Sequence, residues 1–262
     1  MKNELKNKVV LITGASSGIG AALAAEYARN GANVILLARR IDLITKKAAE
    51  LSRKFNKCIA VRGDVNKDGD LENAVKEGLK HFNKIDIVIA NAGIGVPGNL
   101  EDLNLAAYRK QFETSVFGVL RTIYATLPEL KKTKGNLCII GSVNGLVSFS
   151  TGASAYTMSK FAIRGLAKSL SLEFSPYGIS VTHIMPGFVD TNFNVKPGER
   201  AEKKYRWLKI SPEKAAELIS QAIKNRDLEA VLTRHGKMAV YMERFAPFLL
   251  RELGFLFSKI FK

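Results

Sequence analysis

The sequence predicts an α/β fold, a single domain with a doubly wound parallel sheet and helices on both of its faces. Short runs rich in valine, isoleucine and leucine alternate along the chain with longer amphipathic segments, which is the pattern of repeated strand–helix–strand units. These runs are almost continuously apolar, as strands are when helices cover both faces of their sheet. The chain of 262 residues is long enough for one large domain of this kind, and its length requires no second one.

Six strands are predicted, each an apolar run followed by glycine or polar residues. They span residues 8–14, 33–39, 57–65, 85–93, 135–142 and 179–187. The segments between them predict helices over residues 18–31, 40–56, 67–82, 105–131 and 154–174. Right-handed crossovers bring the carboxyl ends of all the strands to one edge of the sheet. Ligands of such sheets bind at this edge, and each motif described below falls there.

The stretch TGASSGIG, residues 13–20, follows the first predicted strand and opens the first helix. Backbone amides at a helix N-terminus attract phosphate, and glycines let a pyrophosphate come close to the chain. We expect Gly14 and Gly18 to make this room and Gly20 to permit close packing of helix on sheet. A glycine cluster at this place in a strand–helix–strand unit predicts a Rossmann-type dinucleotide site.

The end of the second strand reads LLARR, where a carboxylate is expected if the cofactor carries a free ribose 2′-hydroxyl. Arg39 and Arg40 instead offer guanidinium groups to a 2′-phosphate, and Ser16 can add a hydroxyl. The alternative is that both arginines only begin a solvated helix. Because the carboxylate is missing, the sequence favours NADPH (NADP⁺) over NADH. Asp64, at the end of the third strand, is placed to accept a hydrogen bond from the adenine amino group or to cap the next turn.

Tyr156 and Lys160 are four residues apart in YTMSK and therefore share one face of a helix. A tyrosine with the ordinary pKa of about 10 is a poor proton donor at neutral pH. A lysine ammonium one turn away stabilises the phenolate and is expected to lower that pKa. Ser142 ends the fifth strand, where its hydroxyl can hold a substrate oxygen beside the phenol.

With these residues the chain resembles the short-chain dehydrogenase/reductase family, NADP-preferring and of the common length, over about residues 7 to 195. TGASSGIG resembles the cofactor loop of that family, GDV its adenine contact, NAG its strand-four element and PGFVDT the segment beside the nicotinamide amide. Together these motifs give the candidate cofactor-binding residues Gly14, Ser16, Ser17, Gly18, Ile19, Gly20, Arg39, Arg40, Asp64, Val65, Asn91, Ala92, Gly93, Tyr156, Lys160, Pro186, Gly187, Val189 and Thr191.

The resemblance implies hydride transfer between the nicotinamide and a carbonyl carbon. Ser142, Tyr156 and Lys160 fall on the family's catalytic triad, in which tyrosine protonates the oxygen, serine orients it, and lysine holds the ribose hydroxyls. Two departures stand out. Ser115 occupies the place of an asparagine that is thought to bend the helix and hold a water molecule, which makes it a fourth candidate, and the Ser142–Tyr156 spacing is one residue longer than usual.

Three regions are predicted, namely a dinucleotide-binding and catalytic core (1–195), a substrate lid (196–210) and a C-terminal helical extension of the same domain (211–262). Residues 194–209 hold six basic against two acidic residues, together with Tyr205 and Trp207. This segment is either a solvated helix or a lid that touches an anionic surface while its aromatics cover an apolar substrate.

The last 25 residues contain an apolar stripe at helical spacing, formed by Leu249, Leu253, Leu256, Phe257, Ile260 and Phe261. Three interpretations stay open for it. The helix pairs two copies of the chain, closes the substrate pocket, or lies on a membrane surface.

The formal net charge of +16 favours contact with anions, although a solvated lysine-rich surface explains it equally well. The sequence lacks a concentrated basic and aromatic surface of the kind that binds nucleic acid. It predicts no metal site. Cys58 and Cys138 lie in apolar runs and are expected to be reduced core thiols. The N-terminus lacks the apolar stretch of a secretion signal, so a cytoplasmic protein is predicted, with peripheral membrane contact through the tail as an open alternative.

The function predicted is an NADPH-dependent oxidoreductase that transfers a hydride to a ketone or aldehyde, on a hydrophobic or lipid-like substrate. A 3-oxoacyl-carrier-protein reductase is the alternative within the enzyme class. A catalytically idle NADP-binding module is the alternative outside it. By analogy with the family, a homodimer or homotetramer is expected.

Overall fold

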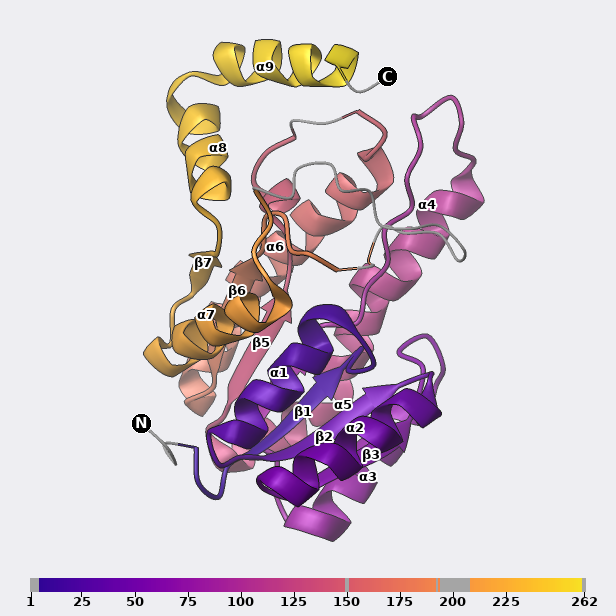
Figure 1. Ribbon diagram of the computed structural model, residues 1–262, viewed down its shortest axis with the longest axis vertical. Helices are drawn as coiled ribbons and strands as arrows, with labels where there is room; N and C mark the ends of the chain where they lie inside the picture. The colour runs from indigo at the N-terminus through magenta and orange to yellow at the C-terminus, as the bar shows by residue number, and fades with distance from the viewer. Residues whose placement is uncertain (1–4, 149–150, 192, 194–207, 261–262) are drawn as a thin grey trace.

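The computed structural model describes residues 5–148, 151–191, 193 and 208–260, the side chains of 255–260 excepted. A parallel sheet of seven strands runs through the centre of the described chain (Figure 1). The strands are β1 Val9–Thr13, β2 Asn33–Ala38, β3 Cys58–Arg62, β4 Ile87–Ala90, β5 Asn136–Ile140, β6 Ser180–Met185 and β7 Glu229–Val231. Their order in the sheet is β3-β2-β1-β4-β5-β6-β7. The direction of strand addition reverses between β1 and β4, and this reversal opens a crevice at the carboxyl ends.

Helices cover both faces of the sheet. They are α1 Gly18–Arg29, α2 Ile41–Lys54, α3 Asp70–Phe82, α4 Leu105–Phe112, α5 Gly118–Thr133, α6 Ser154–Phe174, α7 Pro212–Asn225, α8 Arg234–Phe245 and α9 Pro247–Ile260. Short turns of other helical types are η1 Glu113–Phe117, η2 Val143–Gly145 and η3 Ser175–Tyr177.

Alternation along β1 shows how two cores form around one sheet. Val10 and Ile12 pack in a cluster with side chains of α1, α2 and α7, whereas Val9 and Leu11 pack in a second cluster with side chains of α3, α5 and α6. All four side chains are buried, because successive residues of a strand point to opposite faces. The doubly wound, two-sided fold predicted from the sequence is confirmed.

The structure corrects the sequence prediction in two places. Residues 211–262 are not helical throughout, because Glu229–Val231 forms the edge strand β7 beside β6. This strand has three half-buried residues, too short a run to give an apolar signal. The helix expected over 105–131 is interrupted by the π-helical turn η1 between α4 and α5.

Helices α8 and α9 extend past the carboxyl ends of the strands, at the far end of the molecule from α3 (Figure 1). Each packs more extensively on the other than on any other element. Within the described residues, no helix combines the length and apolar character needed to cross a bilayer. Cys58 and Cys138 are buried and unpaired, as predicted.

Candidate active site

A cavity of about 1100 Å³ opens at the carboxyl ends of the strands. Two of the predicted site residues, Gly20 and Ser115, do not line it. All the others do, together with residues of α8 and α9. The fold therefore gathers the separate sequence motifs around one space.

The structure shows a further role for the glycines of the β1–α1 loop, and the pyrophosphate room predicted for Gly14 and Gly18 stays a prediction. Gly14 has φ +68°, and a Cβ there would lie 2.9 Å from the Cα of Ala92 and 3.0 Å from Nδ2 of Asn91. At Gly18, with φ +53°, it would lie 3.1 Å from Cγ2 of Thr191. The missing side chains thus permit left-handed backbone and close approach of neighbouring segments. A Cβ at Gly20 would meet the carbonyl oxygen of Gly14, so this glycine serves packing, as expected.

Asn91 and Thr13 fix the loop to the end of β4. The Asn91 amide group donates to the carbonyl oxygens of Thr13 (2.9 Å) and Gly14 (3.3 Å). The Thr13 hydroxyl in turn accepts from the backbone nitrogens of Asn91 and Ala92, both at 3.0 Å. These bonds place the loop beside the strand end that borders the cavity.

The residues of the loop fit the phosphates of a dinucleotide. Ser17 is the N-cap of α1 but makes no side-chain capping bond, so the first amides of the helix lack the side-chain partner that caps usually supply. Next to them, Arg40 Nη2 donates to the hydroxyls of Ser16 and Ser17, both at 2.8 Å. A helix N-terminus beside an arginine is the donor set that binds phosphate groups.

Arg39 and Asp64 lie further along the same rim. Arg39 is 70% exposed, and its Nη1 is 3.9 Å from Oδ2 of Asp64. The Asp64 carboxylate accepts from the backbone nitrogen of Asn66 at 3.1 Å, so it caps the next turn, which is the alternative left open from the sequence. It also lines the cavity.

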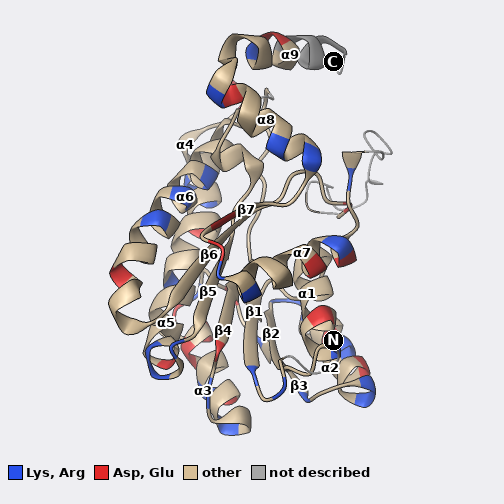
Figure 2. Cartoon of the chain, turned by 90° about the vertical axis from the view of Figure 1, so that its left-hand side faces the viewer, with Lys and Arg blue, Asp and Glu red and all other residues tan. Residues whose placement is uncertain are grey.

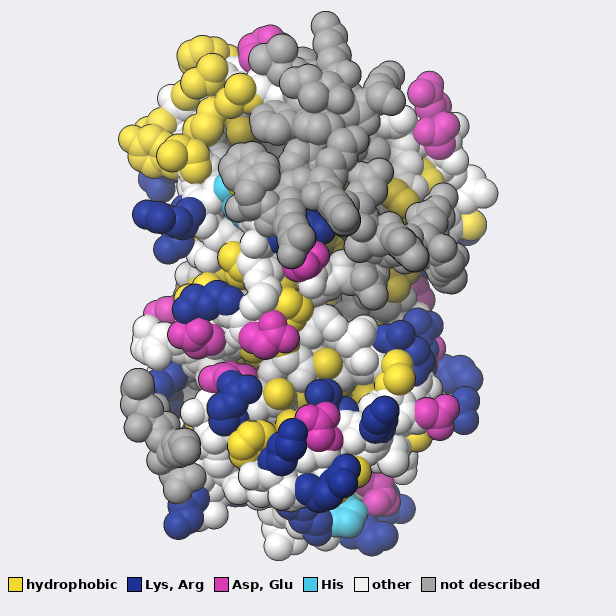
Figure 3. Space-filling model, viewed as in Figure 1, with side chains coloured by type: hydrophobic (Ala, Val, Ile, Leu, Met, Phe, Trp, Pro, Cys, Tyr) yellow, Lys and Arg dark blue, Asp and Glu magenta, His cyan; other side chains and the backbone are white. Residues whose placement is uncertain are grey.

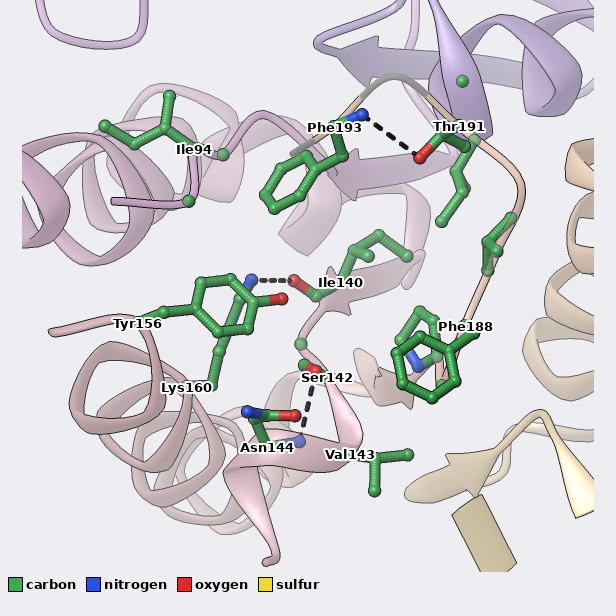
Figure 4. Close-up of a pocket in the computed structure, with 18 of the residues that line it drawn as sticks. Ile94, Ile140, Ser142, Val143, Asn144, Tyr156, Lys160, Phe188, Thr191 and Phe193 are labelled. Carbon is green, nitrogen blue, oxygen red and sulfur yellow. Dashed lines mark hydrogen bonds between the residues drawn. The ribbon is translucent and has the colours of Figure 1, made fainter. Parts of the chain in front are cut away.

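At the other end of the cavity, Ser142, Tyr156 and Lys160 converge (Figure 4). Tyr156 and Lys160 come from the same face of α6, and the lysine Nζ lies 5.5 Å from the centre of the tyrosine ring. Ser142 follows β5, and its hydroxyl accepts from the backbone nitrogen of Asn144 at 3.1 Å. Lys160 Nζ donates to the carbonyl oxygen of Ile140 at 3.1 Å, which anchors its side chain beneath the site.

Burial sets the protonation of both groups. It raises the pKa of the Tyr156 phenol, and the hydroxyl of Ser142 opposes this shift in part. Burial lowers the pKa of Lys160 to about 8. The prediction that Lys160 brings the tyrosine pKa down is therefore not met, because desolvation of the phenolate is the larger effect. At neutral pH the phenol keeps its proton and the lysine its charge.

The comparisons with known proteins agree with this geometry. Residues 8–202 match the family model described as short chain dehydrogenase. The chain belongs to this family.

Relatives of the short-chain dehydrogenase family resemble the chain over most of its length. The oxidoreductase UcpA of Salmonella typhimurium is 40% identical over 189 residues, 72% of each chain. An alcohol dehydrogenase of Thermococcus sibiricus complexed with 5-hydroxy-NADP is 33% identical, with a TM-score of 0.77 over 86% of this chain and 96% of that one. A 3-ketoacyl-ACP reductase of Sinorhizobium meliloti is 29% identical, with a TM-score of 0.78 over 88% and 99%.

Ser115 lies behind the cavity of this short-chain dehydrogenase. It is buried in η1, and its hydroxyl accepts from Nε2 of Gln111 at 2.9 Å. The same Nε2 lies within hydrogen-bond distance of the Ile94 carbonyl oxygen and the Ser159 hydroxyl, while Gln111 Oε1 accepts from the Val96 nitrogen. Gln111 thus ties a cavity wall to α6. Sequence reasoning missed it, although a glutamine one turn before Ser115 was the available signal.

The segment from 186 to 193 forms the next wall. Phe188 stacks on His235 with ring centres 5.3 Å apart, and the rings of Phe193 and Tyr156 meet edge to face with centres 6.0 Å apart. The expected lid over 196–210 lies outside the described residues except for 208–210, of which Leu208 and Lys209 line the cavity.

The far wall comes from the C-terminal helices, which the sequence motifs did not place. Met238 and Met242 of α8 line the cavity, as do Leu250 and Leu253 of α9. In the predicted stripe, Leu253 faces the cavity, whereas Leu249 is exposed and its neighbour Leu250 is buried. The stripe positions at 256, 257, 260 and 261 lie outside the described side chains. Among the residues that the structure describes, no group of side chains is arranged to hold a metal ion.

Proposed function

We propose that the protein is an NADPH-dependent reductase of apolar ketones or aldehydes. The observation that carries this proposal is the convergence of Ser142, Tyr156 and Lys160 at one end of a cavity that holds a phosphate-binding loop at the other. A module that only bound a dinucleotide has no need of a buried tyrosine, lysine and serine around the reacting end.

The chain's own residues supply the acid and the orientation. Tyr156 protonates the carbonyl oxygen, while the Ser142 hydroxyl donates to the same oxygen. Lys160 holds the ribose hydroxyls and offsets the charge left on the phenolate. The bound cofactor supplies the hydride.

The cofactor preference rests on Arg40. Its guanidinium is held by Ser16 and Ser17 at the loop that fits the phosphates, where it can meet a 2′-phosphate. Arg39 supplies a second guanidinium on the same rim of the cavity. It contacts the Asp64 carboxylate only weakly.

The substrate class rests on the far wall. Met238, Met242, Leu250 and Leu253 border the space beyond Tyr156, and these side chains offer no hydrogen-bond donor to a polar substrate. We therefore propose a hydrophobic or lipid-like carbonyl compound. The unpaired, buried cysteines support a reducing, cytoplasmic setting.

The alternative within this chemistry is reduction of a 3-oxoacyl group on a carrier protein. The likeness to the 3-ketoacyl-ACP reductase of Sinorhizobium meliloti and the basic residues of segment 194–209 support it, because acyl carriers are acidic. It requires carrier-linked substrates to react much faster than the same acyl group on a small thiol.

We also propose that the chain forms a homodimer or homotetramer. Tyr124 of α5 and Phe161 and Leu172 of α6 are exposed, and these are the apolar side chains that a subunit contact on α5 and α6 would cover. Sedimentation velocity measures the state directly.

The deciding experiment is a panel of apolar, polar and carrier-linked carbonyl compounds, read by NADPH oxidation. We expect turnover of apolar ketones and none by Tyr156→Phe, which keeps its affinity for NADPH because the ring remains. Turnover by Tyr156→Phe comparable with that of the unaltered enzyme contradicts the assigned acid. Absence of turnover on every carbonyl, with NADPH still bound, supports the idle module instead.

A further inference from the structure

Helix α8 and the start of α9 carry an apolar stripe that faces outward. Tyr241 is 62% exposed, Phe245 63% and Phe248 73%, and Met238 and Leu249 are exposed beside them. Figure 3 shows hydrophobic side chains gathered over this corner of the molecule. We call these five residues the outer stripe. It differs from the stripe predicted from the sequence, whose described members Leu249 and Leu253 point to different sides.

The outer stripe is continuous along α8. Met238, Tyr241 and Phe245 are three and four residues apart, so they share one side of the helix. The rings of Tyr241 and Phe245 touch, with centres 4.6 Å apart. The neighbouring side of the helix is turned inward, where Met242 and Ala239 line the cavity. One helix therefore separates the substrate space from an exposed apolar surface.

Basic side chains flank the outer stripe. Lys237 and Arg244 are each within one helical turn of Tyr241 and are exposed, and the Arg244 guanidinium lies 5.6 Å from the centre of the Phe245 ring. Arg234 and Arg251 are also exposed on these helices. Figure 2 shows the basic positions on α8, and the whole chain has a net charge of +16. Aromatic side chains flanked by lysine and arginine match the boundary between acyl chains and anionic headgroups.

We propose that α8 and the start of α9 dock on an anionic lipid surface through the outer stripe. The corner projects from the body of the molecule (Figure 1), a shape suited to a flat, deformable surface. A second copy brings the same charge excess to the stripe, since α8 carries Arg234, Lys237 and Arg244 against Glu243 alone, so it offers less opposite charge than an anionic lipid surface does. An anionic lipid surface meets both the apolar and the basic side chains.

Docking places the cavity next to the lipid. Met238 belongs to the outer stripe and also lines the cavity, so the wall of the substrate space reaches the docked surface. An apolar substrate dissolved in the bilayer then has a short path to Tyr156. This route rests on the proposed function, whereas docking itself does not.

The test is flotation of the full chain with phosphatidylcholine vesicles, with and without phosphatidylglycerol. We expect binding to the anionic vesicles. For the double variant Tyr241→Ser, Phe245→Ser we expect roughly tenfold less bound protein, because the two rings that docking buries in the lipid are lost. The double variant Lys237→Gln, Arg244→Gln is expected to lose binding at physiological salt. Leu100→Ser removes a comparably exposed apolar side chain (74%) outside α8 and α9 and is expected to bind as the unaltered chain does.

Two readouts separate docking from other effects. Turnover of a small water-soluble carbonyl compound is expected to be the same in all variants, since none of the altered residues lines the cavity. This holds whether or not the vesicles bind, so a failure of the proposed reaction and a failure of docking are distinguishable. The proposal is overturned if the unaltered chain does not float with anionic vesicles, or if the Tyr241, Phe245 variant floats equally well. A change from dimer to monomer in that variant without vesicle binding assigns the stripe to a second copy instead.

Discussion

In the proposed function, Arg40 is the residue on which the preference for NADPH depends. Arg40→Ala removes the guanidinium beside Ser16 and Ser17, and a charge-assisted hydrogen bond contributes about 1.5–3 kcal/mol. We expect NADPH affinity to fall roughly 10- to 100-fold while NADH affinity stays nearly constant. Titration of both cofactors measures this. Arg39→Ala is the matched comparison and is expected to lose less, because Arg39 is exposed and only loosely paired with Asp64. Equal affinities for NADPH and NADH in the unaltered chain contradict the assignment.

Burial of the Lys160 ammonium lowers the free energy of unfolding of the chain. Its pKa falls from 10.5 to about 8 on burial. Below pH 8 the ammonium is charged in both the folded and the unfolded state, but only the folded state holds that charge away from water. The shift corresponds to about 3 kcal/mol, and the bond to Ile140 returns about 1 kcal/mol. We therefore expect Lys160→Met to unfold at a higher temperature than the unaltered chain at pH 7, by roughly 5 °C, while turnover is lost.

The pH dependence of this gain follows from the sign of the shift. Between pH 8 and 10.5 the folded state releases the lysine proton first, so the penalty of burial declines as the pH rises. Above 10.5 both states hold a neutral amine and the gain disappears. Thermal unfolding of both proteins across this range measures it. A gain that stays constant with pH contradicts the buried charge as its cause.

At the scale of the element, α9 lines the cavity with Leu250 and Leu253, and Leu250 is the more deeply buried of the two. Leu250 is buried with Val143 and Val147, whereas the next residue back, Leu249, is 46% exposed. We expect Leu250→Ala to cost about 2–3 kcal/mol of unfolding free energy, the lower part of the range for buried leucine because the cluster is small. It is also expected to raise KM for apolar substrates. Leu249→Ala is the matched control and is expected to change stability by less than about 0.5 kcal/mol. Similar losses in both variants contradict this orientation of α9.

The elements differ in how far the sequence could predict them. Strands β1 to β6 and the helices between them follow from local periodicity, and the pair Tyr156 and Lys160 follows from one helical turn of spacing. The strand β7 gives no such signal in three residues. Which leucine of α9 turns inward depends on Val143 and Val147, more than a hundred positions earlier in the chain, and periodicity alone cannot carry that information.

Site residues show the same division. Gly14, Ser16 and Arg40 could be proposed from the sequence because each stands at or just after the end of a predicted strand, a position that topology makes meaningful. The close approach of Ala92, which follows β4, to Gly14 could not be predicted. Gln111 was missed because its bonds join η1, the loop after β4 and α6, and only the folded chain brings these segments together.

On the scale of the whole molecule, the two cores around the sheet are large, and α8 and α9 belong to neither. The clusters on the two faces of the sheet contain residues of α1, α2, α3, α5, α6 and α7, whereas the cluster under α9 has Val143, Val147 and Leu250 as its buried members. The residues expected to bind the dinucleotide belong to the sheet and its flanking helices, whereas the apolar wall of the cavity belongs to α8 and α9. We therefore expect that cofactor binding and substrate selection can be separated in this fold.

A chain ending at Lys237 tests this separation. It keeps the Thr233 cap and Gly236, which pack against Val143 and β7, and loses the rest of α8 and all of α9. We expect it to retain its sheet, seen by circular dichroism. We also expect it to bind NADPH within roughly threefold of the full chain, since the phosphate-binding loop between β1 and α1 is left intact. Turnover of long apolar ketones is expected to fall at least tenfold more than turnover of a small soluble aldehyde, because only the long substrate needs the lost wall. Equal losses for both substrates, or loss of NADPH binding in a folded chain, show instead that the C-terminal helices hold the reacting end of the site in place.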